Sequence, residues 1–370
     1  MLGASGACIV VRYHQPVLPH NSLMKNLIER AAKWLQAEQG RSGNVVERMS
    51  YVGVQFRNYL SDERDEILHN TRLKYGNAAK KVDDTIKAVR QIMVAFLRGN
   101  QGEALEKTYR LMQTMKFDQL MPGVPMYKCR ENSKLYHYSK DEMFHIPFEK
   151  RHLVGNQRFS LAGIPCLYLG GSSYICWEEL GRKDFSTSNY CGYSLKDSVN
   201  MFDMMLPASI TNEHQIRRIL LILLCSLPAT RDHVFKPEYI LPQSVLHSLI
   251  KRSYYNHKPF CVRYYSSHLL NGDADYFEHN FKEDALPRYV NYVFPASNSQ
   301  NKGYSNELRV LFNQTDTISP MRETLVDPSH LIDAGSHDAY LDSQFGLVDS
   351  ILDVKLGFQS KRQAVQFLVM

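Results

Sequence analysis

The sequence lacks the features that mark a secreted, a membrane-spanning or a zinc-binding protein. Its seven cysteines are an odd number, and no two of them have the C-x-x-C spacing. A disulfide framework and a zinc site are therefore not expected. No stretch approaches the roughly 18–20 apolar residues of a membrane span, and Met1 to Val11 has neither the basic region nor the apolar core of a signal peptide. We expect a reduced, cytoplasmic chain without a metal.

A strong excess of charge of one sign is also missing. The 44 basic and 38 acidic residues give a formal net charge of +6, which permits phosphate-bearing partners without identifying one. Hydrophobic residues make up 44% and charged residues 22% of the chain, a balance that excludes wholesale disorder. With 370 residues and no internal repeat or low-complexity tract, the chain is long enough for two ordinary domains or one large one.

The first third of the chain has almost no strand-like alternation and is typical of helices. Between Asn21 and Phe117, apolar residues recur at the spacing of one helical face, as in Ile86, Val89, Met93, Phe96 and Leu97. Gly76-Asn77 and Gly99-Asn100 are natural breaks between helices. The pattern predicts a helical domain of three to five helices over residues 1–120.

The character of the sequence changes at Pro122-Gly123-Val124-Pro125, which suits a linker or the entry to a second domain. After it, short aromatic and β-branched runs predict strands at Cys166–Leu169, Cys261–Tyr265, Tyr289–Phe294 and Leu308–Phe312. Interleaved helices are predicted at Tyr174–Leu180, Glu213–Leu224 and Pro242–Arg252. Residues 121–370 are thus predicted to form an α+β domain.

The densest segment covers residues 144–182. It combines a basic, polar loop, a buried strand, the turn Gly170-Gly171-Ser172-Ser173 and a short helix. Such a strand–turn–helix can bring backbone N–H groups to an anion. A tight turn without a ligand is the alternative, because the Lys-Ser/Thr ending of a phosphate-binding P-loop is missing. The helix carries Glu178 and Glu179, which point about 100° apart, so only one of them can face a site.

Arginines and aromatic residues surround this segment. Arg130 and Arg158 are candidates for binding a pyrophosphate, because a guanidinium fork binds phosphate oxygens in a bidentate way. Surface ion pairs are the alternative for each. No Ser-His-Asp constellation is recognisable near Ser266 in the sequence, which argues against Ser266 as a nucleophile.

Together with the strand and helix elements downstream of it, this segment resembles the RES domain family, which is named for an arginine, a glutamate and a serine in that order. The resemblance covers about residues 126–315 and rests on four elements in sequence. These are Arg130; Arg158-Phe159-Ser160 with Gly163; Leu167-Tyr168-Leu169, Ser172-Ser173 and Cys176-Trp177-Glu178-Glu179-Leu180; and Leu241-Pro242-Gln243 followed by Val262-Arg263-Tyr264-Tyr265-Ser266. The family glutamate falls on Glu179, and the serine falls on Ser266, with Ser267 as a one-residue alternative.

The resemblance implies an ADP-ribosyltransferase-like fold and an enzyme that consumes NAD without a metal. Arg130, Glu179 and Ser266 are the implied catalytic residues, and Arg158, Ser160 and Tyr168 the implied NAD-binding residues. The sequence departs from the family at Phe159-Ser160, where Trp-Asn is usual, and at Glu131, where many members have tyrosine. Tyr168 is then the candidate to pack on the nicotinamide or ribose ring, with Tyr136 or Tyr138 in reserve.

Several acceptors and partners fit this resemblance. Transfer to water makes the protein an NAD glycohydrolase, transfer to phosphate a phosphorylase, and transfer to a protein an ADP-ribosyltransferase. Many family members are toxins paired with an antitoxin, so an antitoxin or regulatory protein is an implied partner, as is a second copy in a homodimer. NAD degradation is the preferred interpretation.

The helical part offers a second interpretation. Arg64 and His69 resemble the Arg-x4-His signature of HEPN domains, which are helical modules that often cleave RNA as dimers. This implies RNA binding or cleavage by residues 1–120. The alternatives are a solvated helix face and a protein-interaction module that holds the second domain inactive. The basic residues here are interspersed with Asp83 and Asp84, unlike the single-signed face typical of nucleic-acid binding.

Overall fold

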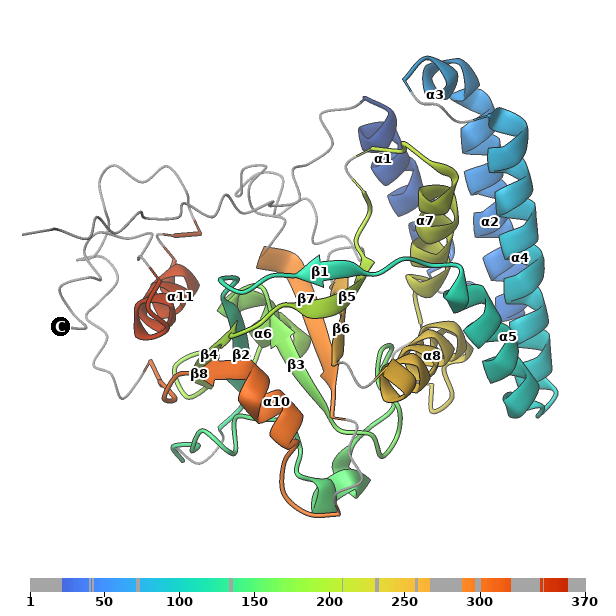
Figure 1. The fold of residues 1–370 in the computed structure, drawn as a ribbon. Coiled ribbons are helices and arrows are strands. Elements are labelled where there is room, and N and C mark those ends of the chain that lie inside the picture. Colours follow the sequence, from blue (N-terminus) through green and yellow to red (C-terminus); the bar gives the residue numbers. More distant parts are fainter. Residues whose placement is uncertain are drawn as a thin grey trace, which may run out of the picture.

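The structure is a computed structural model with an α+β fold (Figure 1), as predicted. Helices come first along the chain, and one mixed sheet with further helices comes after them. The structure describes residues 22–39, 41, 43–70, 74–132, 136–207, 209–229, 233–256, 259–266, 288–296, 301–320, 340–341 and 343–358.

Five helices precede the sheet, in agreement with the predicted helical region: α1 (Ser22–Ala37), α2 (Val45–Asp62), α3 (Arg64–Asn70), α4 (Tyr75–Leu97) and α5 (Gln101–Gln113). The break at Gly99-Asn100 is confirmed: Gly99 has a positive φ of 85°, and the Asn100 side chain caps α5 by accepting from the Glu103 N–H. The break at Gly76-Asn77 is wrong, because both residues lie in the first turn of α4, where backbone N–H groups have no partner within the helix in any case.

The described strands form one eight-stranded sheet in the order β1-β5-β6-β7-β3-β2-β4-β8. Only β5 and β6 pair in parallel. β2 and β3 pair at a single position, Tyr127 with Gly170. The strands are β1 (Asp118–Leu120), β2 (Met126–Arg130), β3 (Cys166–Gly170), β4 (Asn189–Leu195), β5 (Val199–Met204), β6 (Phe260–Tyr265), β7 (Val290–Pro295) and β8 (Phe312–Gln314).

The helices within and after the sheet are α6 (Ser173–Glu179), α7 (Glu213–Cys225), α8 (Ile240–Asn256), α10 (Asn306–Leu311) and α11 (Gln344–Lys355), with short 3-10 helices η1 (Phe148–Leu153) and η2 (Pro237–Tyr239). The three predicted helices are confirmed. The strand predicted at Leu308–Phe312 is wrong for all but its last residue: Ser305 caps a helix there, accepting from the Leu308 N–H, and the strand β8 begins only at Phe312.

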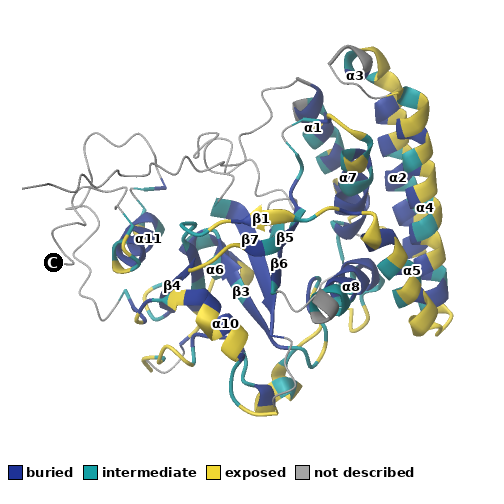
Figure 2. Cartoon of the chain, viewed as in Figure 1, coloured by how far each residue is buried: buried dark blue, intermediate teal, exposed yellow. Residues whose placement is uncertain are grey.

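The two faces of the sheet pack against different apolar clusters, and burial is concentrated along the central strands (Figure 2). We call one face the helical face. Cys166, Tyr168, Val262 and Tyr264 lie on it and pack into the cluster that contains α7, α8 and the N-terminal helices. Leu167, Leu169 and Cys261 alternate with these residues and belong to the cluster on the opposite face, which also contains α10.

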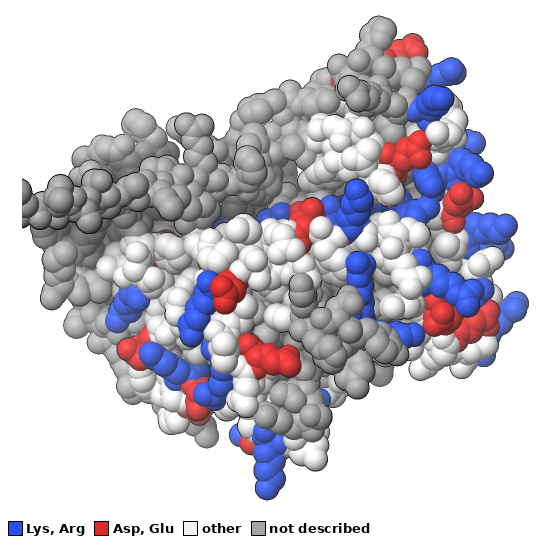
Figure 3. Space-filling view, in the orientation of Figure 1, with Lys and Arg blue, Asp and Glu red and all other residues white. Residues whose placement is uncertain are grey.

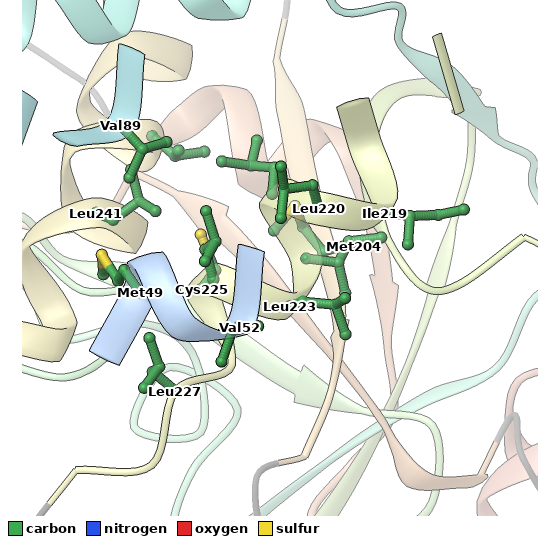
Figure 4. Packing of buried hydrophobic residues seen from close by; sticks show 14 of the residues in the cluster. Met49, Val52, Val89, Met204, Ile219, Leu220, Leu223, Cys225, Leu227 and Leu241 are labelled. Atoms are coloured by element: carbon green, nitrogen blue, oxygen red, sulfur yellow. The ribbon is translucent and has the colours of Figure 1, made fainter. Parts of the chain in front are cut away.

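The N-terminal helices and the sheet domain share one core. Met49 and Val52 of α2, Val89 of α4 and several residues of α7 belong to a single buried cluster (Figure 4). β1 pairs with β5, so residues 118–120 are already part of the sheet. The boundary between residues 120 and 121 stays a prediction. In the described part of the chain, the structure contains no helix that could cross a membrane.

Candidate active site

The helix α6 lies close against the strand that precedes it. β3 ends at Gly170, and a Cβ atom there would lie 2.5 Å from Cγ2 of Ile175 and 2.6 Å from Sγ of Cys176, so only glycine fits. The N–H groups of Gly171, Ser173 and Ile175 donate to the Val290 carbonyl, the Asp349 carboxylate and the Ser172 hydroxyl. Because these donors have protein acceptors, the turn is the tight turn that the sequence left as an alternative to an anion site.

The two adjacent glutamates of α6 have different environments. Glu178 is 4% exposed and accepts hydrogen bonds from the Tyr174 hydroxyl and from Nε of Arg182. Glu179 is exposed, and its Oε1 accepts from Oγ of Ser266 at 2.6 Å and from Nδ2 of Asn291 at 2.7 Å. Glu178 therefore serves the packing of α6, and Glu179 is the carboxylate that meets the predicted serine.

Ser266 and Asn291 approach Glu179 from two neighbouring strands. Ser266 directly follows β6, is buried, and donates its backbone N–H to the Tyr289 carbonyl. Asn291 lies in β7, opposite Tyr264 and Gly170. With two buried donors on one oxygen, the Glu179 carboxylate is held in one orientation. Asn291 was not among the predicted site residues, although a polar residue within the otherwise apolar run Val290–Pro295 is a signal that could have identified it.

Tyr264 connects the glutamate to Arg158. Burial raises the pKa of the Tyr264 hydroxyl, the negative charge of Glu179 raises it further, and the positive charge of Arg158 lowers it. Both charges thus lie within electrostatic reach of this one side chain. The ring of Phe159 packs on Tyr264, with 4.6 Å between ring centroids. Asn291, which donates to Glu179, is paired with Tyr264 in the sheet, so Glu179 and Arg158 both lie near the helical face.

Arg158 is anchored by backbone carbonyls at the end of α7. Its Nη1 donates to the Cys225 carbonyl and, at 3.0 Å, to the Leu227 carbonyl. Its guanidinium lies 5.2 Å from the centre of the Tyr239 ring. Burial lowers the pKa of Arg158, although an arginine keeps its charge in proteins. Both carbonyls use one nitrogen of a group that has five N–H donors.

Tyr168 and Ser160 complete this group. Tyr168 projects from β3 on the helical face and donates its hydroxyl to the Phe159 carbonyl at 3.2 Å. Burial raises the pKa of Tyr168 well above its usual value; Tyr264 raises this pKa further, and a hydrogen bond with Ser160 lowers it. Ser160 is buried and donates to the Gly155 carbonyl. Five of the six predicted residues are thus connected through Tyr264. Arg158, Ser160 and Tyr168 lie at Phe159, whose ring packs on Tyr264, and Glu179 and Ser266 lie at Asn291, which is paired with Tyr264 in the sheet.

Arg130 is the predicted residue that the structure does not bring to this group. It ends β2 with its side chain exposed, donates to the Glu142 carbonyl at 2.7 Å and lies 4.2 Å from the Tyr138 ring centre. Along β2, Tyr127 packs with α11 while Met126 belongs to the opposite face, and alternation places Arg130 with Met126. The reserve Tyr136 packs on Tyr138, beside Arg130. Ser267 lies outside the described residues.

Of the predicted RNase pair Arg64 and His69, the structure describes only the side chain of Arg64. Arg64 begins α3, and its guanidinium lies 5.2 Å from the centre of the Tyr75 ring. The side chain of His69 lies outside the described residues. In the view of Figure 3, basic side chains over α4 and α5 are mixed with acidic ones. RNA binding by this part stays a prediction.

The chemical character of the site is set by its members. An exposed carboxylate held by two donors can stabilise a positive charge that develops beside it. A guanidinium binds phosphate oxygens, and aromatic side chains offer flat apolar surfaces to rings. Among the residues that the structure describes, no group of three or more His, Cys, Asp and Glu side chains is placed to hold a metal ion.

Comparison with known proteins gives one informative similarity. The chain is 30% identical, over 245 aligned residues, to a protein of Bacillus subtilis (strain 168) named "Putative toxin YopC"; the match covers 58% of this chain and 53% of that protein. The chain thus spans about half the length of this curated relative. No protein-family profile matches the chain, and no solved structure matches it.

Proposed function

We propose that the protein is a toxin that degrades NAD by cleaving the bond between nicotinamide and ribose. The observation that carries the proposal is the contact between Glu179 and Ser266, which brings together the glutamate and the serine of the resemblance across 87 residues of sequence. Arg158, Tyr168 and Ser160 around Tyr264 supply groups suited to the rest of a dinucleotide. The toxin role is supported by the name of the B. subtilis relative.

Cleavage of the bond between nicotinamide and ribose requires a negative charge that is held in position beside C1′. As nicotinamide leaves, C1′ of the ribose gains oxocarbenium character, and the Glu179 carboxylate stabilises that positive charge where it develops. The logic is that of the carboxylates of glycosidases, because a glycosidic bond is broken. Ser266 and Asn291 keep the carboxylate oriented before the reaction, so little reorganisation is needed in the transition state.

The pyrophosphate and the rings of NAD are assigned to the residues near Phe159, whose ring packs on Tyr264. Arg158 binds the pyrophosphate through N–H groups other than those of Nη1. Tyr168 packs on the nicotinamide or the ribose. Arg130, on the opposite face of β2, has no part in this assignment. The acceptor needs only a path to C1′, so water, phosphate and a protein side chain all fit.

The test is to incubate the purified protein with NAD, with and without phosphate, and to identify the products. We expect nicotinamide release, which Glu179→Gln lowers by roughly 100-fold or more. ADP-ribose as the second product identifies a hydrolase, ADP-ribose 1″-phosphate a phosphorylase, and a modified protein a transferase. Absence of nicotinamide release from the intact, folded protein under both conditions would refute the proposed function.

A further inference from the structure

Two arginines from different parts of the chain hold the same two short segments. Arg48 of α2 donates from Nη2 to the Pro228 carbonyl at 2.9 Å and from Nη1 to the Glu238 carboxylate. Arg158 donates to the carbonyl of the adjacent residue, Leu227, and lies over the ring of Tyr239, the neighbour of Glu238. The helical part and the candidate NAD site therefore meet at residues 227–228 and 238–239.

The contact on the Arg48 side is buried and charged. Arg48 is 6% exposed, Glu238 5% and Glu38 0%. Nε of Arg48 donates to Glu38, whose other oxygen accepts from Arg41 at 2.6 Å. The four side chains carry two positive and two negative charges, so the network is balanced. Removing Arg48 would leave the buried Glu238 carboxylate without its ion-pair partner, which is strongly unfavourable; the network therefore holds both segments in one geometry.

Apolar packing supports the same junction. Met49 and Val52, close to Arg48 on α2, belong to one buried cluster with Cys225 and Leu227 (Figure 4). The carbonyls of these last two residues are the ones that accept from Arg158. Since interiors are close-packed, a shift of α2 is transmitted to these carbonyls.

We propose that the N-terminal helical part is a structural component of the NAD site, and that Arg48 is a positioning residue for Arg158. Arg48 fixes Pro228 and Glu238, these set the Leu227 carbonyl and the Tyr239 ring, and the latter orient the guanidinium that binds the pyrophosphate. The inference rests on the proposed function. It gives the helices a role in substrate binding that requires neither RNA cleavage nor a separate partner.

The test compares full-length variants in the NAD assay. Arg48→Lys keeps the charge but loses the guanidinium fork that reaches both the Pro228 carbonyl and the Glu238 carboxylate, and Glu238→Gln keeps the shape but loses a charge. Both should raise KM for NAD about 10-fold, as expected for a weakened charged hydrogen bond, and change kcat less than about 3-fold, because pyrophosphate binding is common to ground state and transition state. Arg158→Lys should show the same split.

Phe56→Leu is the matched control, because Phe56 is a fully buried residue of the same helix, lies about two turns after Arg48 and stacks its ring on Tyr59. It should leave KM within about 2-fold at comparable loss of stability. Unchanged KM in both folded Arg48 and Glu238 variants, or an equal rise in Phe56→Leu, would overturn the inference. If Arg48→Lys does not fold, Glu238→Gln decides. Failure of the wild-type protein to bind or cleave NAD would instead refute the proposed function and the inference with it.

Discussion

The carboxylate of Glu179 and the hydroxyl of Ser266 form a hydrogen bond of 2.6 Å across 87 residues of sequence. The two residues belong to different elements: Glu179 ends the seven-residue helix α6, and Ser266 directly follows the central strand β6. Asn291 bonds the same carboxylate oxygen. The proposed NAD site requires of its glutamate a carboxylate that is exposed yet held in one orientation, and Glu179 has this arrangement.

The two glutamates of α6 provide a matched pair for the first prediction. Glu179→Gln keeps the size of the side chain and removes the charge, so NAD turnover should fall by roughly 100-fold or more. Glu178→Gln should leave turnover within about 3-fold and lower thermal stability, because Glu178 pairs with Arg182 in a buried position. Nicotinamide release and thermal unfolding measure the two effects. The reverse pattern would assign the catalytic role to Glu178.

The second prediction concerns the donors. Ser266→Ala and Asn291→Ala each remove one hydrogen bond to the Glu179 carboxylate, and each should lower kcat about 10-fold with a smaller change in KM. Because both act on one oxygen, the double variant should lose less than the product of the two single losses. Fully multiplicative losses would show that the two side chains act independently of each other and would contradict a shared role on one carboxylate oxygen.

The third prediction separates the structure from the family resemblance. The resemblance makes Arg130 catalytic, whereas its position on the face opposite Tyr168 predicts that Arg130→Ala changes NAD turnover less than about 3-fold. Arg158→Ala should weaken NAD binding at least 10-fold, since a charged hydrogen bond to phosphate is lost. A large loss of turnover in a folded Arg130→Ala protein would require the strand β2 to present its other face to the substrate.

The part of the site that is contiguous in sequence could be predicted from the sequence. Gly170, Ser172 and Glu179 lie in one strand–turn–helix whose signature is local, and the predicted strand and helix are confirmed. Tyr264 and Asn291 were not assigned to the site. The pairing of β6 with β7 places them opposite each other, where Asn291 reaches Glu179, and strand pairing between distant segments is not encoded in local periodicity.

Arg130 illustrates the limit for strand residues. On a five-residue strand, an offset of one position moves a side chain to the other face of the sheet, and the sequence of β2 has apolar residues on both faces. In the folded protein, the helices α6 and α11 cover the face of β2 on which Tyr127 lies. Arg130 is therefore on the other face, and this depends on the assembled fold.

The last prediction concerns the carboxylate that holds the start of α6. Asp349 of α11 accepts from the Ser173 N–H at 2.9 Å and from the Tyr340 hydroxyl at 2.6 Å, and burial raises its pKa from 3.8 to about 6. Between these pH values the folded protein holds a proton that the unfolded chain releases. The contribution of Asp349 to stability is therefore present at low pH and is lost as the pH rises from about 4 to about 6.

Asp349→Asn cannot ionise and keeps an oxygen that can accept from Ser173, so the wild-type free energy of unfolding should fall relative to that of the variant over this pH range and stay level above it. Urea unfolding at a series of pH values measures both curves. Their difference cancels other titrating groups, among them His145, whose pKa burial lowers from 6.5 to about 4 and which destabilises the fold as the pH falls through that range. A difference that does not change between pH 4 and 6 would mean that Asp349 is ionised in the folded protein, and that α11 holds α6 through a buried charge.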